Sequence, residues 1–501
     1  MTTLATGTTG SDAKDALTRD ALTVLQPGFP GTTAPDWLLR HLGQGLASVG
    51  LFGRNIASPE QLAALTAQLR TERDDVLVAI DEEGGDVTRL EVHTGSSFPG
   101  NHALGAVDDT ELTGQVAHEL GRRLKECGVN FNWAPSADVN ANPRNPVIGV
   151  RSFGTEPDLV ARHTAAYVTG LQAAGVAACT KHFPGHGDTA VDSHLALPRI
   201  DVGTEVLSER DLTPFRAAIA AGSHAVMSAH ILVPALDPDR PATLSRRILT
   251  DLLRGELGYQ GLIVTDGMEM QAIAATYGIE RGSVLAVAAG ADAICVGGGL
   301  NDEGTVRLLR DALVAAVRAG DLPEERLADA AERVRALARW AAAQTPSAGG
   351  APDHADIGLT AARRALRVTG ADTFTPLTEA PYVALFTPVA NIAVGDETPW
   401  GVAADLARAL PGTGSGHFSG TDAGAEALAA AGERRIVAVV RDEHRHPWMA
   451  AALDTLLAAR PDTVVVEMGV PQAPARGALH VATHGAARVC AQAATEVLTA
   501  R

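Results

Sequence analysis

Polar residues follow five successive hydrophobic runs between residues 76 and 267, each where a buried strand would end. A lone aspartate in such a place is commonly a helix N-cap or an exposed loop residue. Five successive runs that end in carboxylates, imidazoles or cations instead indicate one shared site for acid, base or nucleophilic chemistry. These residues are Asp81, Glu82, Glu83 and Arg89, then Asn132, Asp138 and Arg151, then Lys181 and His182, then Ser228 and His230, and finally Asp266.

The longest polar segment is KHFPGHGDTAVDSH, residues 181–194. Pro184, Gly185 and Gly187 disfavour a helix, so we expect an irregular loop beside the site. Its metal-ligating residues allow a metal-dependent barrel hydrolase as one interpretation. They are His182, His186, Asp188, Asp192 and His194. Such hydrolases usually have a His-x-His pair in the first strand, and no such pair lies near Leu25.

The elements that must position these residues are short hydrophobic runs that alternate with helix-periodic stretches from residue 20 to 340. Helices are predicted, for example, at 157–173 and 209–221. The eight runs end near Leu25, Leu51, Asp81, Trp133, Lys181, Ala229, Thr265 and Val296. Eight strand–helix units predict an α/β fold, a (β/α)8 TIM-like barrel with its active site at the carboxyl ends of the strands. The alternative is an open doubly wound sheet, but the glycine-rich phosphate turn usual after its first strand is not present.

The segment TPSAGGAP at residues 345–352 has the small and rigid residues of a linker. We therefore predict a barrel domain over residues 1–344, a linker over 345–356 and a C-terminal domain over 357–501. The last part alternates helix-like and strand-like segments, which predicts a smaller open α/β sandwich domain. The expected helices are 359–368, 448–459 and 487–499, and the expected strands are 382–387, 436–440, 463–468 and 479–483. This domain offers no clustered catalytic residues.

Composition excludes some classes of partner. With 59 acidic and 41 basic residues the formal net charge is −18, which argues against a nucleic-acid partner. The four cysteines are widely scattered and are expected to be free thiols. The N-terminal segment lacks a basic start followed by an apolar run, and no apolar stretch of about 18 residues occurs. A cytoplasmic, soluble protein without a membrane partner is expected.

Several motifs occur in an order that is more specific than the strand pattern. They are IDEEGGDVTRL, RSFG, KHFPGHGDTAVDSH, SAH, PATLS and VTDGMEM, accompanied by LFGRNI, FPGNHALG and DLTPF. Together they resemble glycoside hydrolase family 3, within it the β-N-acetylglucosaminidase branch, over roughly residues 20–340. The C-terminal part resembles the second domain of two-domain members only loosely.

The resemblance implies a division of catalytic roles. Asp266 corresponds to the family's nucleophile, which forms a covalent glycosyl-enzyme with retention of configuration. Asp192 and His194 correspond to an acid/base dyad. A histidine that titrates near neutral pH can protonate the leaving oxygen and then deprotonate water, while the aspartate orients its ring. This dyad replaces the second carboxylate of most glycosidases.

The resemblance also assigns residues that bind the hydroxyl groups of the terminal sugar. They are Asp81, Arg89, Arg151, Lys181 and His182. Charge-assisted hydrogen bonds to hydroxyls suit a pocket for a polar monosaccharide. A purely structural pairing of Arg89 with Asp81 is the alternative.

Other residues near the motifs receive weaker assignments. His230 and Met268 are expected to line the site by position, whereas His186 and Asp188 are expected to shape the loop. The chain departs from the family pattern at Asp86, where EGGR is commoner than EGGD, and at Asn132-Trp133. These departures leave the fine substrate preference open.

Taken together, the resemblance predicts a retaining exo-acting β-N-acetylglucosaminidase (β-N-acetylhexosaminidase) that uses no metal or organic cofactor and serves cell-wall recycling. A phosphorylase on the same residues is the closest alternative, because a histidine repels incoming phosphate less than a carboxylate would. A β-glucosidase of the same family, a metal-dependent barrel hydrolase and a sugar-binding barrel are the others. No oligomeric state is predicted.

Overall fold

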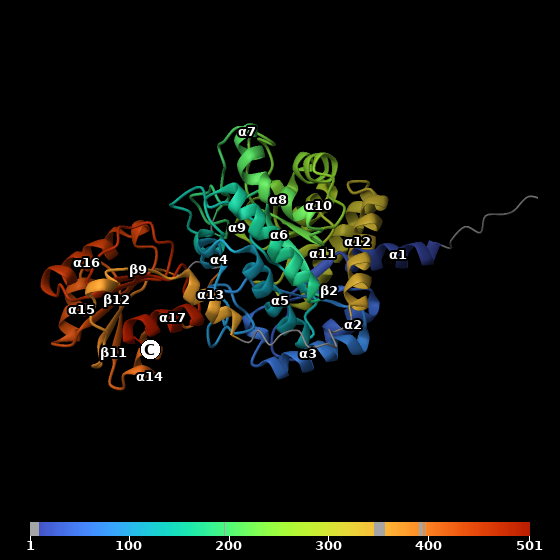
Figure 1. Cartoon of the computed structure of the whole chain (residues 1–501). Coiled ribbons are helices and arrows are strands. Elements are labelled where there is room, and N and C mark those ends of the chain that lie inside the picture. The colour runs from blue at the N-terminus through green and yellow to red at the C-terminus, as the bar shows by residue number, and fades with distance from the viewer. Residues whose placement is uncertain (1–9, 195, 345–355, 390–393, 396, 501) are drawn as a thin grey trace, which may run out of the picture.

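The computed structural model describes residues 10–194, 196–344, 356–389, 394–395 and 397–500. Two α/β units organise the molecule. The first is a barrel built from the N-terminal two thirds of the chain, and the second is an open sheet that lies beside it (Figure 1).

The barrel strands confirm the eight hydrophobic runs of the sequence. They are β1 (Leu25–Pro27), β2 (Ser48–Leu51), β3 (Leu77–Ile80), β4 (Phe131–Asn132), β5 (Ala177–Phe183), β6 (Ala225–Ser228), β7 (Leu262–Thr265) and β8 (Ile294–Val296). Strands β2 to β7 pair in parallel in sequence order, and β8 pairs in parallel with β1. A single bridge between Val264 and Ala293 connects the two sets. The strands are therefore arranged in the order of a TIM-like barrel.

Alternating side chains give the barrel two separate apolar layers. Leu77 and Ala79 point inward and pack with Met227 and other residues of the interior, whereas Val78 and Ile80 point outward toward the helices. Helix α12 (Glu324–Ala343) contributes Leu337 and neighbouring residues to the interior cluster, so this helix closes the barrel from below. Because both faces of each strand are covered, the strands can be apolar throughout.

The helices outside the barrel largely follow the predicted intervals. They are α1 (Gly10–Thr23), α2 (Asp36–Gln44), α3 (Pro59–Glu72), α4 (Asn101–Val107), α5 (Thr110–Glu126), α6 (Pro157–Ala173), α7 (Thr204–Val206), α8 (Leu212–Ala220), α9 (Gln271–Tyr277), α10 (Ile279–Ala289) and α11 (Glu303–Ala319). The predicted helix 157–173 is confirmed as α6. The one predicted at 209–221 differs, because its first residues form a π-helical turn, η3 (Leu207–Asp211), before α8 begins.

The second sheet has the order β11-β10-β12-β13-β14-β9, with only β9 antiparallel to its neighbour. Its strands are β9 (Arg367–Thr369), β10 (Tyr382–Phe386), β11 (Gly414–Phe418), β12 (Ile436–Val440), β13 (Val464–Glu467) and β14 (Leu479–Ala482). Its helices are α13 (Ile357–Ala365), α14 (Ala403–Ala409), α15 (Ala423–Ala431), α16 (Pro447–Ala459) and α17 (Arg488–Thr499). Separate apolar clusters cover the two faces, so the unit is the expected α/β sandwich.

Two details of this unit differ from the prediction. The helix expected at 359–368 ends at Ala365, because Leu366 is extended and the following residues form the edge strand β9. Strand β11 and helices α14 and α15 were not predicted. The predicted linker at 345–356 lies outside the described residues except for Asp356, so the exact domain boundary stays a prediction.

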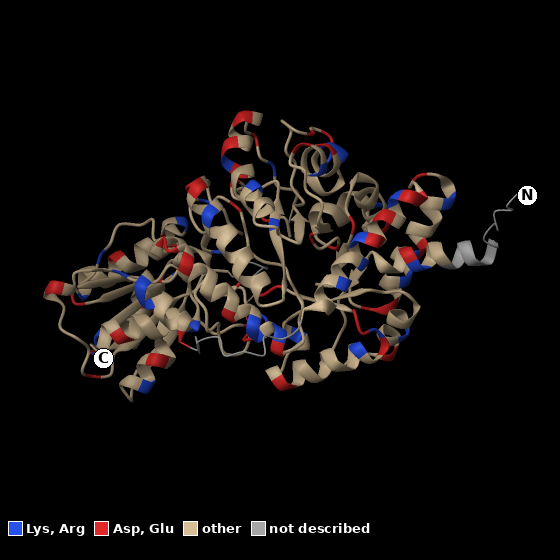
Figure 2. Cartoon of the chain, turned by 45° about the vertical axis from the view of Figure 1, so that its right-hand side comes forward, with Lys and Arg blue, Asp and Glu red and all other residues tan. Residues whose placement is uncertain are grey.

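The two units are joined by polar contacts across their interface. Asp86 of the barrel forms an ion pair with Arg441 and accepts a hydrogen bond of 2.7 Å from the backbone N–H of Ala486. Arg488 lies 3.3 Å from a carboxylate oxygen of Glu91. Figure 2 shows acidic and basic residues interspersed along the helices of both units. Within the described residues, no helix combines the length and the apolar character that a membrane crossing requires.

Candidate active site

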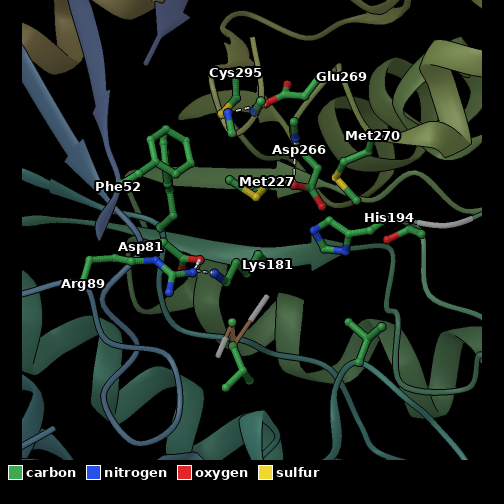
Figure 3. A pocket seen from close by; sticks show the side chains of 18 of the residues that line it. Phe52, Asp81, Arg89, Lys181, His194, Met227, Asp266, Glu269, Met270 and Cys295 are labelled. Atoms are coloured by element: carbon green, nitrogen blue, oxygen red, sulfur yellow. Dashed lines mark hydrogen bonds and ion pairs between the residues drawn. The ribbon is translucent and has the colours of Figure 1, made fainter. Parts of the chain in front are cut away.

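A cavity of about 540 Å³ lies at the carboxyl ends of the barrel strands (Figure 3). Seven of the eight predicted site residues line it: Asp81, Arg89, Arg151, Lys181, His182, His194 and Asp266. The eighth, Asp192, lies behind His194. The structure therefore brings together side chains that follow strands β3, β4, β5 and β7, as expected for a TIM-like barrel.

Asp266 follows β7 directly, and two hydrogen bonds that involve backbone N–H groups fix its position. Its N–H donates to the carbonyl of Ser228 at 3.2 Å, and the N–H of Gly267 donates to its Oδ1 at 2.8 Å. Burial raises the pKa of this carboxyl, but the nearby His230, His182 and His194, together with the Gly267 N–H, lower it to about 2. Asp266 is therefore an ionised, oriented carboxylate at neutral pH, as a nucleophile must be.

His194 and Asp192 form a hydrogen-bonded pair at the wall of the same cavity. His194 Nδ1 lies 2.7 Å from Asp192 Oδ1, and the same oxygen accepts the backbone N–H of His194 at 2.9 Å. Burial raises the pKa of Asp192, but these bonds lower it overall. An ionised Asp192 holds the proton on Nδ1 and leaves Nε2 for proton transfer. Figure 3 shows the His194 ring beside Asp266, with Lys181, Asp81 and Arg89 across the cavity.

The floor of the cavity is a network of alternating charges. Lys181 Nζ lies 2.5 Å from Asp81 Oδ1 and 2.6 Å from Glu83 Oε1. Glu83 also binds Arg151, with 2.7 Å between its Oε1 and Arg151 Nη2. Arg89 Nη2 lies 3.6 Å from Asp81 Oδ2, so Arg89 is paired with a carboxylate and lines the cavity as well. Such a set of closely paired carboxylate acceptors and cationic donors is suited to binding sugar hydroxyls.

Buried Asp138 connects the floor to the loop of the dyad. Its Oδ2 lies 2.7 Å from His182 Nδ1, and its Oδ1 accepts the backbone N–H of His186 at 2.6 Å. The other nitrogen of His182, Nε2, lies 3.3 Å from Arg151 Nη2. Because an arginine can only donate, His182 carries its proton on Nδ1 and accepts at Nε2. Asp138 thus fixes both the tautomer and the orientation of His182.

The candidate metal ligands of the loop are occupied by other contacts. The ring nitrogens of His186 lie 2.9 Å from Thr189 Oγ1 and 3.1 Å from Ser193 Oγ, so this histidine shapes the loop as expected. Asp188 forms an ion pair of 2.9 Å with Arg210. His182 and His194 turn their Nδ1 atoms to different carboxylates. Across the described ranges, no group of three or more His, Cys, Asp or Glu side chains could hold a metal ion.

Two residues expected to line the cavity do not. His230 is fully buried below it, where its Nε2 lies 3.0 Å from the carbonyl of Gly267 and its Nδ1 lies 2.8 Å from Thr243 Oγ1. Met268 is fully buried in the outer apolar layer. The prediction for both was wrong: Met268 packs in the outer apolar layer, and the His230 ring is held by Thr243 and the Gly267 carbonyl instead of facing the cavity.

The departures from the family pattern also find explanations. Asp86 pairs with Arg441 of the second unit and does not line the cavity, so the effect of this departure on substrate preference stays open. Asn132 is buried, and its amide group bonds both the N–H and the carbonyl of Glu82. Only Trp133 of that pair lines the cavity, where its indole N–H donates to Gln26 at 3.2 Å.

Further lining residues were not predicted from the sequence. Phe52, Trp133 and Met227 provide apolar walls, and Val394, Gly395 and Glu397 of the second unit reach the cavity. Glu269 organises the loop after β8, because its Oε1 accepts the backbone N–H groups of three consecutive glycines, Gly297, Gly298 and Gly299. The second unit thus completes a cavity whose polar floor belongs entirely to the barrel.

Comparison with known proteins identifies relatives of the chain. Residues 32–337 match the family model described as the glycosyl hydrolase family 3 N terminal domain. Beta-hexosaminidase A of Pseudoalteromonas piscicida is 41% identical over 265 residues, which are 48% of this chain and 44% of that protein. The chain therefore spans less than half the length of that relative. Beta-hexosaminidase of Alkalilimnicola ehrlichii is 38% identical over 279 residues, covering 54% of this chain and 79% of the relative.

A solved structure is similar over nearly the whole chain. It is the structure of a glycoside hydrolase family 3 beta-N-acetylglucosaminidase from Paenibacillus sp. str. FPU-7, with a TM-score of 0.85 and 36% sequence identity. The match covers 97% of this chain and 96% of that one, so it includes both the barrel and the second unit.

Proposed function

The chain belongs to glycosyl hydrolase family 3 and is a glycoside hydrolase, and from this we propose that it is a retaining exo-acting β-N-acetylglucosaminidase. The observation that carries the proposal is the shared position of Asp266 and His194 in one cavity, with Asp192 holding the His194 ring. A fixed carboxylate and a separate proton donor are what a two-step displacement requires.

In the first step, the Asp266 carboxylate attacks the anomeric carbon while protonated His194 gives its Nε2 proton to the glycosidic oxygen. The bond from carbon to the leaving oxygen breaks, a glycosyl ester forms on Asp266, and His194 becomes neutral. In the second step, Nε2 takes a proton from water, whose oxygen attacks the same carbon and releases Asp266. Two inversions give net retention of configuration.

The depth of the cavity supports an exo mode of action. Lys181 and Arg151 lie at its floor and are almost fully buried, at 2% and 5% exposure, whereas Glu397 at its edge is exposed. A terminal sugar bound to the floor residues would leave the rest of the substrate projecting toward that edge. The preference for N-acetylglucosamine rests on the similarity to the relatives and to the Paenibacillus enzyme.

We extend the proposal to cell-wall recycling in the cytoplasm, with fragments that carry terminal N-acetylglucosamine as substrates. Cell fractionation, combined with an assay on muropeptide fragments, tests this part independently of the catalytic mechanism.

Phosphorolysis is the second candidate, because the proton-transfer group is a histidine. A neutral or cationic imidazole repels a phosphate dianion less than a carboxylate would, so phosphate has easier access to the glycosyl-enzyme. The same two steps then release a sugar phosphate in place of the free sugar.

One experiment separates these outcomes. The protein is incubated with an aryl N-acetyl-β-glucosaminide with and without inorganic phosphate, and NMR follows the first-formed product. We expect free N-acetylglucosamine that appears first as the β-anomer, at a rate independent of phosphate. A phosphate-dependent rate with N-acetylglucosamine 1-phosphate as product would establish the phosphorylase. An α-anomer as the first product would contradict the retaining mechanism.

A further inference from the structure

The loop that carries His194 has no regular secondary structure of its own beyond β5. Within the loop, the His186 ring contacts the hydroxyls of Thr189 and Ser193, and the latter residue directly precedes His194. Asn145 donates to the His186 carbonyl at 2.9 Å. These contacts connect His186 with Thr189 and with Ser193, the residue between Asp192 and His194. A displacement of the loop near residue 188 would therefore move the dyad.

Arg210, in the π-helical turn η3, connects this loop to the barrel. Its Nη2 lies 2.9 Å from Asp188 Oδ2 and 3.0 Å from Asp211 Oδ2. One guanidinium group therefore bridges a carboxylate of the loop and a carboxylate at the start of α8. The π-helical turn shifts the residues out of ordinary α-helical spacing and places consecutive residues 210 and 211 in contact with the loop.

The barrel side of this bridge is rigid. The Asp211 side chain is fully buried, whereas those of Arg210 and Asp188 are 20% and 24% exposed. Gly185, at φ +126°, packs directly on Asp211, since an added Cβ would lie 2.9 Å from the Asp211 Cβ. Burial raises the pKa of Asp211, which Arg210 partly offsets, to about 6. The buried carboxylate thus depends on Arg210 for its counter-charge.

We propose that Arg210 is a positioning residue for the reaction, which holds the Asp192–His194 dyad at the cavity by pairing with Asp188 of the same loop. The inference rests on the proposed role of His194 as the proton donor. Arg210 touches neither the cavity nor the reacting atoms, and its effect reaches them through the loop. It also gives the DLTPF motif a function, since Asp211 is its first residue.

The test compares Arg210→Ala, Arg210→Lys and Asp188→Asn with the double variant Arg210→Ala/Asp188→Asn in the full chain. Misplacing a catalytic group by about 1 Å costs on the order of 10²-fold in rate. We therefore expect kcat on a disaccharide to fall by roughly 10- to 100-fold in the alanine and asparagine variants. KM and the binding of N-acetylglucosamine should change little, because the floor residues remain in place. Arg210→Lys should recover part of the rate.

Two comparisons separate a positioning role from a general loss of structure: the double variant against the single variants, and aryl substrates against the disaccharide. The double variant should be no slower than Arg210→Ala alone, because both changes remove the same ion pair. An aryl substrate whose leaving group needs no proton should lose less rate in its first step than the disaccharide. Arg307→Ala is the matched control, since the ion pair of Arg307 with Glu303 lies within α11 and Arg307 does not line the cavity, so kcat should stay unchanged.

Asp188→Asn keeps the proposal testable if Arg210→Ala fails to fold, because the Arg210–Asp211 pair then stays intact. Unchanged kcat in folded Asp188→Asn, or strictly additive losses in the double variant, would overturn the inference. Should His194→Gly leave the disaccharide rate unaffected, the proposed function itself fails. If kcat on the disaccharide falls in His194→Gly but not in the Arg210 and Asp188 variants, only the positioning role of Arg210 is refuted.

Discussion

Asp266 is ionised at neutral pH, since the neighbouring histidines and the Gly267 N–H outweigh the effect of burial and lower its pKa to about 2. Replacing it with alanine removes the group that forms the covalent intermediate in the proposed mechanism. We expect Asp266→Ala to lower kcat/KM by at least about a thousandfold on aryl and disaccharide substrates alike.

Mass spectrometry provides an independent readout for this residue. A 2-fluoro sugar that traps the glycosyl-enzyme should label the peptide containing Asp266 in the native chain and should label nothing in the variant. Label on a different carboxylate would contradict the assignment.

His194 is the residue at which substrates with different leaving groups should behave differently. His194→Gly should slow hydrolysis of a disaccharide by roughly 10²- to 10⁴-fold, because an alkoxide leaving group needs a proton. A nitrophenyl substrate should still form the intermediate quickly, show a burst of product, and then wait for the unassisted attack of water. Azide should relieve that second step, since it attacks without a base.

Asp192→Ala should give a milder form of the same defect, because the imidazole remains but loses its 2.7 Å contact. Equal slowing of both substrate types, without a burst or azide rescue, would indicate that His194 has only a structural role.

For single residues, the sequence predicted the side chains that lie within motifs but not the residues that hold those side chains in place. Asp266, Asp192 and His194 occur in distinctive motifs, and the structure places them together. The role of Asp138 as the shared partner of His182 and His186 depends on two chain segments that meet only in the folded barrel. Met268 illustrates the reverse error, because proximity in sequence to Asp266 does not determine on which side of a turn a side chain lies.

At the level of structural elements, the turn after β3 determines where Arg89 lies. Glu82 is almost fully buried and accepts the backbone N–H groups of Arg89 and Leu90 at 2.7 and 2.8 Å. Burial, only partly offset by these hydrogen bonds, raises the pKa of Glu82 to about 7. The folded chain therefore keeps a proton on Glu82 that the unfolded chain releases near its ordinary pKa of 4.5.

This difference predicts a pH dependence of stability. The contribution of Glu82 is fully present below pH 4.5 and is lost as the pH rises through 7, so the free energy of unfolding should fall over that range. Glu82→Gln keeps an acceptor for both N–H groups and removes the titration. The variant should match the wild type at pH 4 and exceed its stability at pH 8 by on the order of 3 kcal/mol.

Urea denaturation at the two pH values measures this effect, and Glu205→Gln at an exposed position of α7 is the control. A constant difference between wild type and Glu82→Gln across the range would contradict the prediction.

Elements with a clear hydrophobic period were predictable, and elements without one were not. The eight barrel strands are continuous buried runs, whereas β11 has the sequence GSGHF and a half-exposed edge position, so it lacks a signal. The π-helical turn before α8 contacts the loop of the dyad through the Arg210–Asp188 pair, a long-range contact that local propensity does not report.

For the whole molecule, the ion pair between Asp86 and Arg441 is the central polar contact between the two units. The Asp86 side chain is 2% exposed and that of Arg441 16%, so Arg441→Ala leaves a buried carboxylate without its counter-charge. Such a loss typically costs about 3 kcal/mol. We expect Arg441→Ala to lower the denaturation midpoint, and Arg445→Ala, which pairs only with Asp442 in the same loop, to leave it nearly unchanged.

Adding Asp86→Asn to Arg441→Ala should restore part of the stability, because the unpaired charge is then absent. A double variant no more stable than Arg441→Ala would show that Asp86 is not the group left uncompensated.

The sequence predicted two α/β units but not how they meet. Residues far apart in the chain form the interface, and the contribution of Glu397 and its neighbours to the cavity follows from that arrangement alone. The sequence indicated no clustered catalytic residues in the second unit, but it did not indicate that this unit supplies part of the cavity wall.

The Asp86–Arg441 contact has a consequence for how family members can be sorted by sequence. A chain with arginine at position 86 would place two guanidinium groups against each other if it docked a second unit in this way. Aspartate after the EGG motif and arginine directly after β12 should therefore occur together. That pair of positions, read from sequence alone, would distinguish chains that dock their second domain as this one does from chains that use the barrel alone.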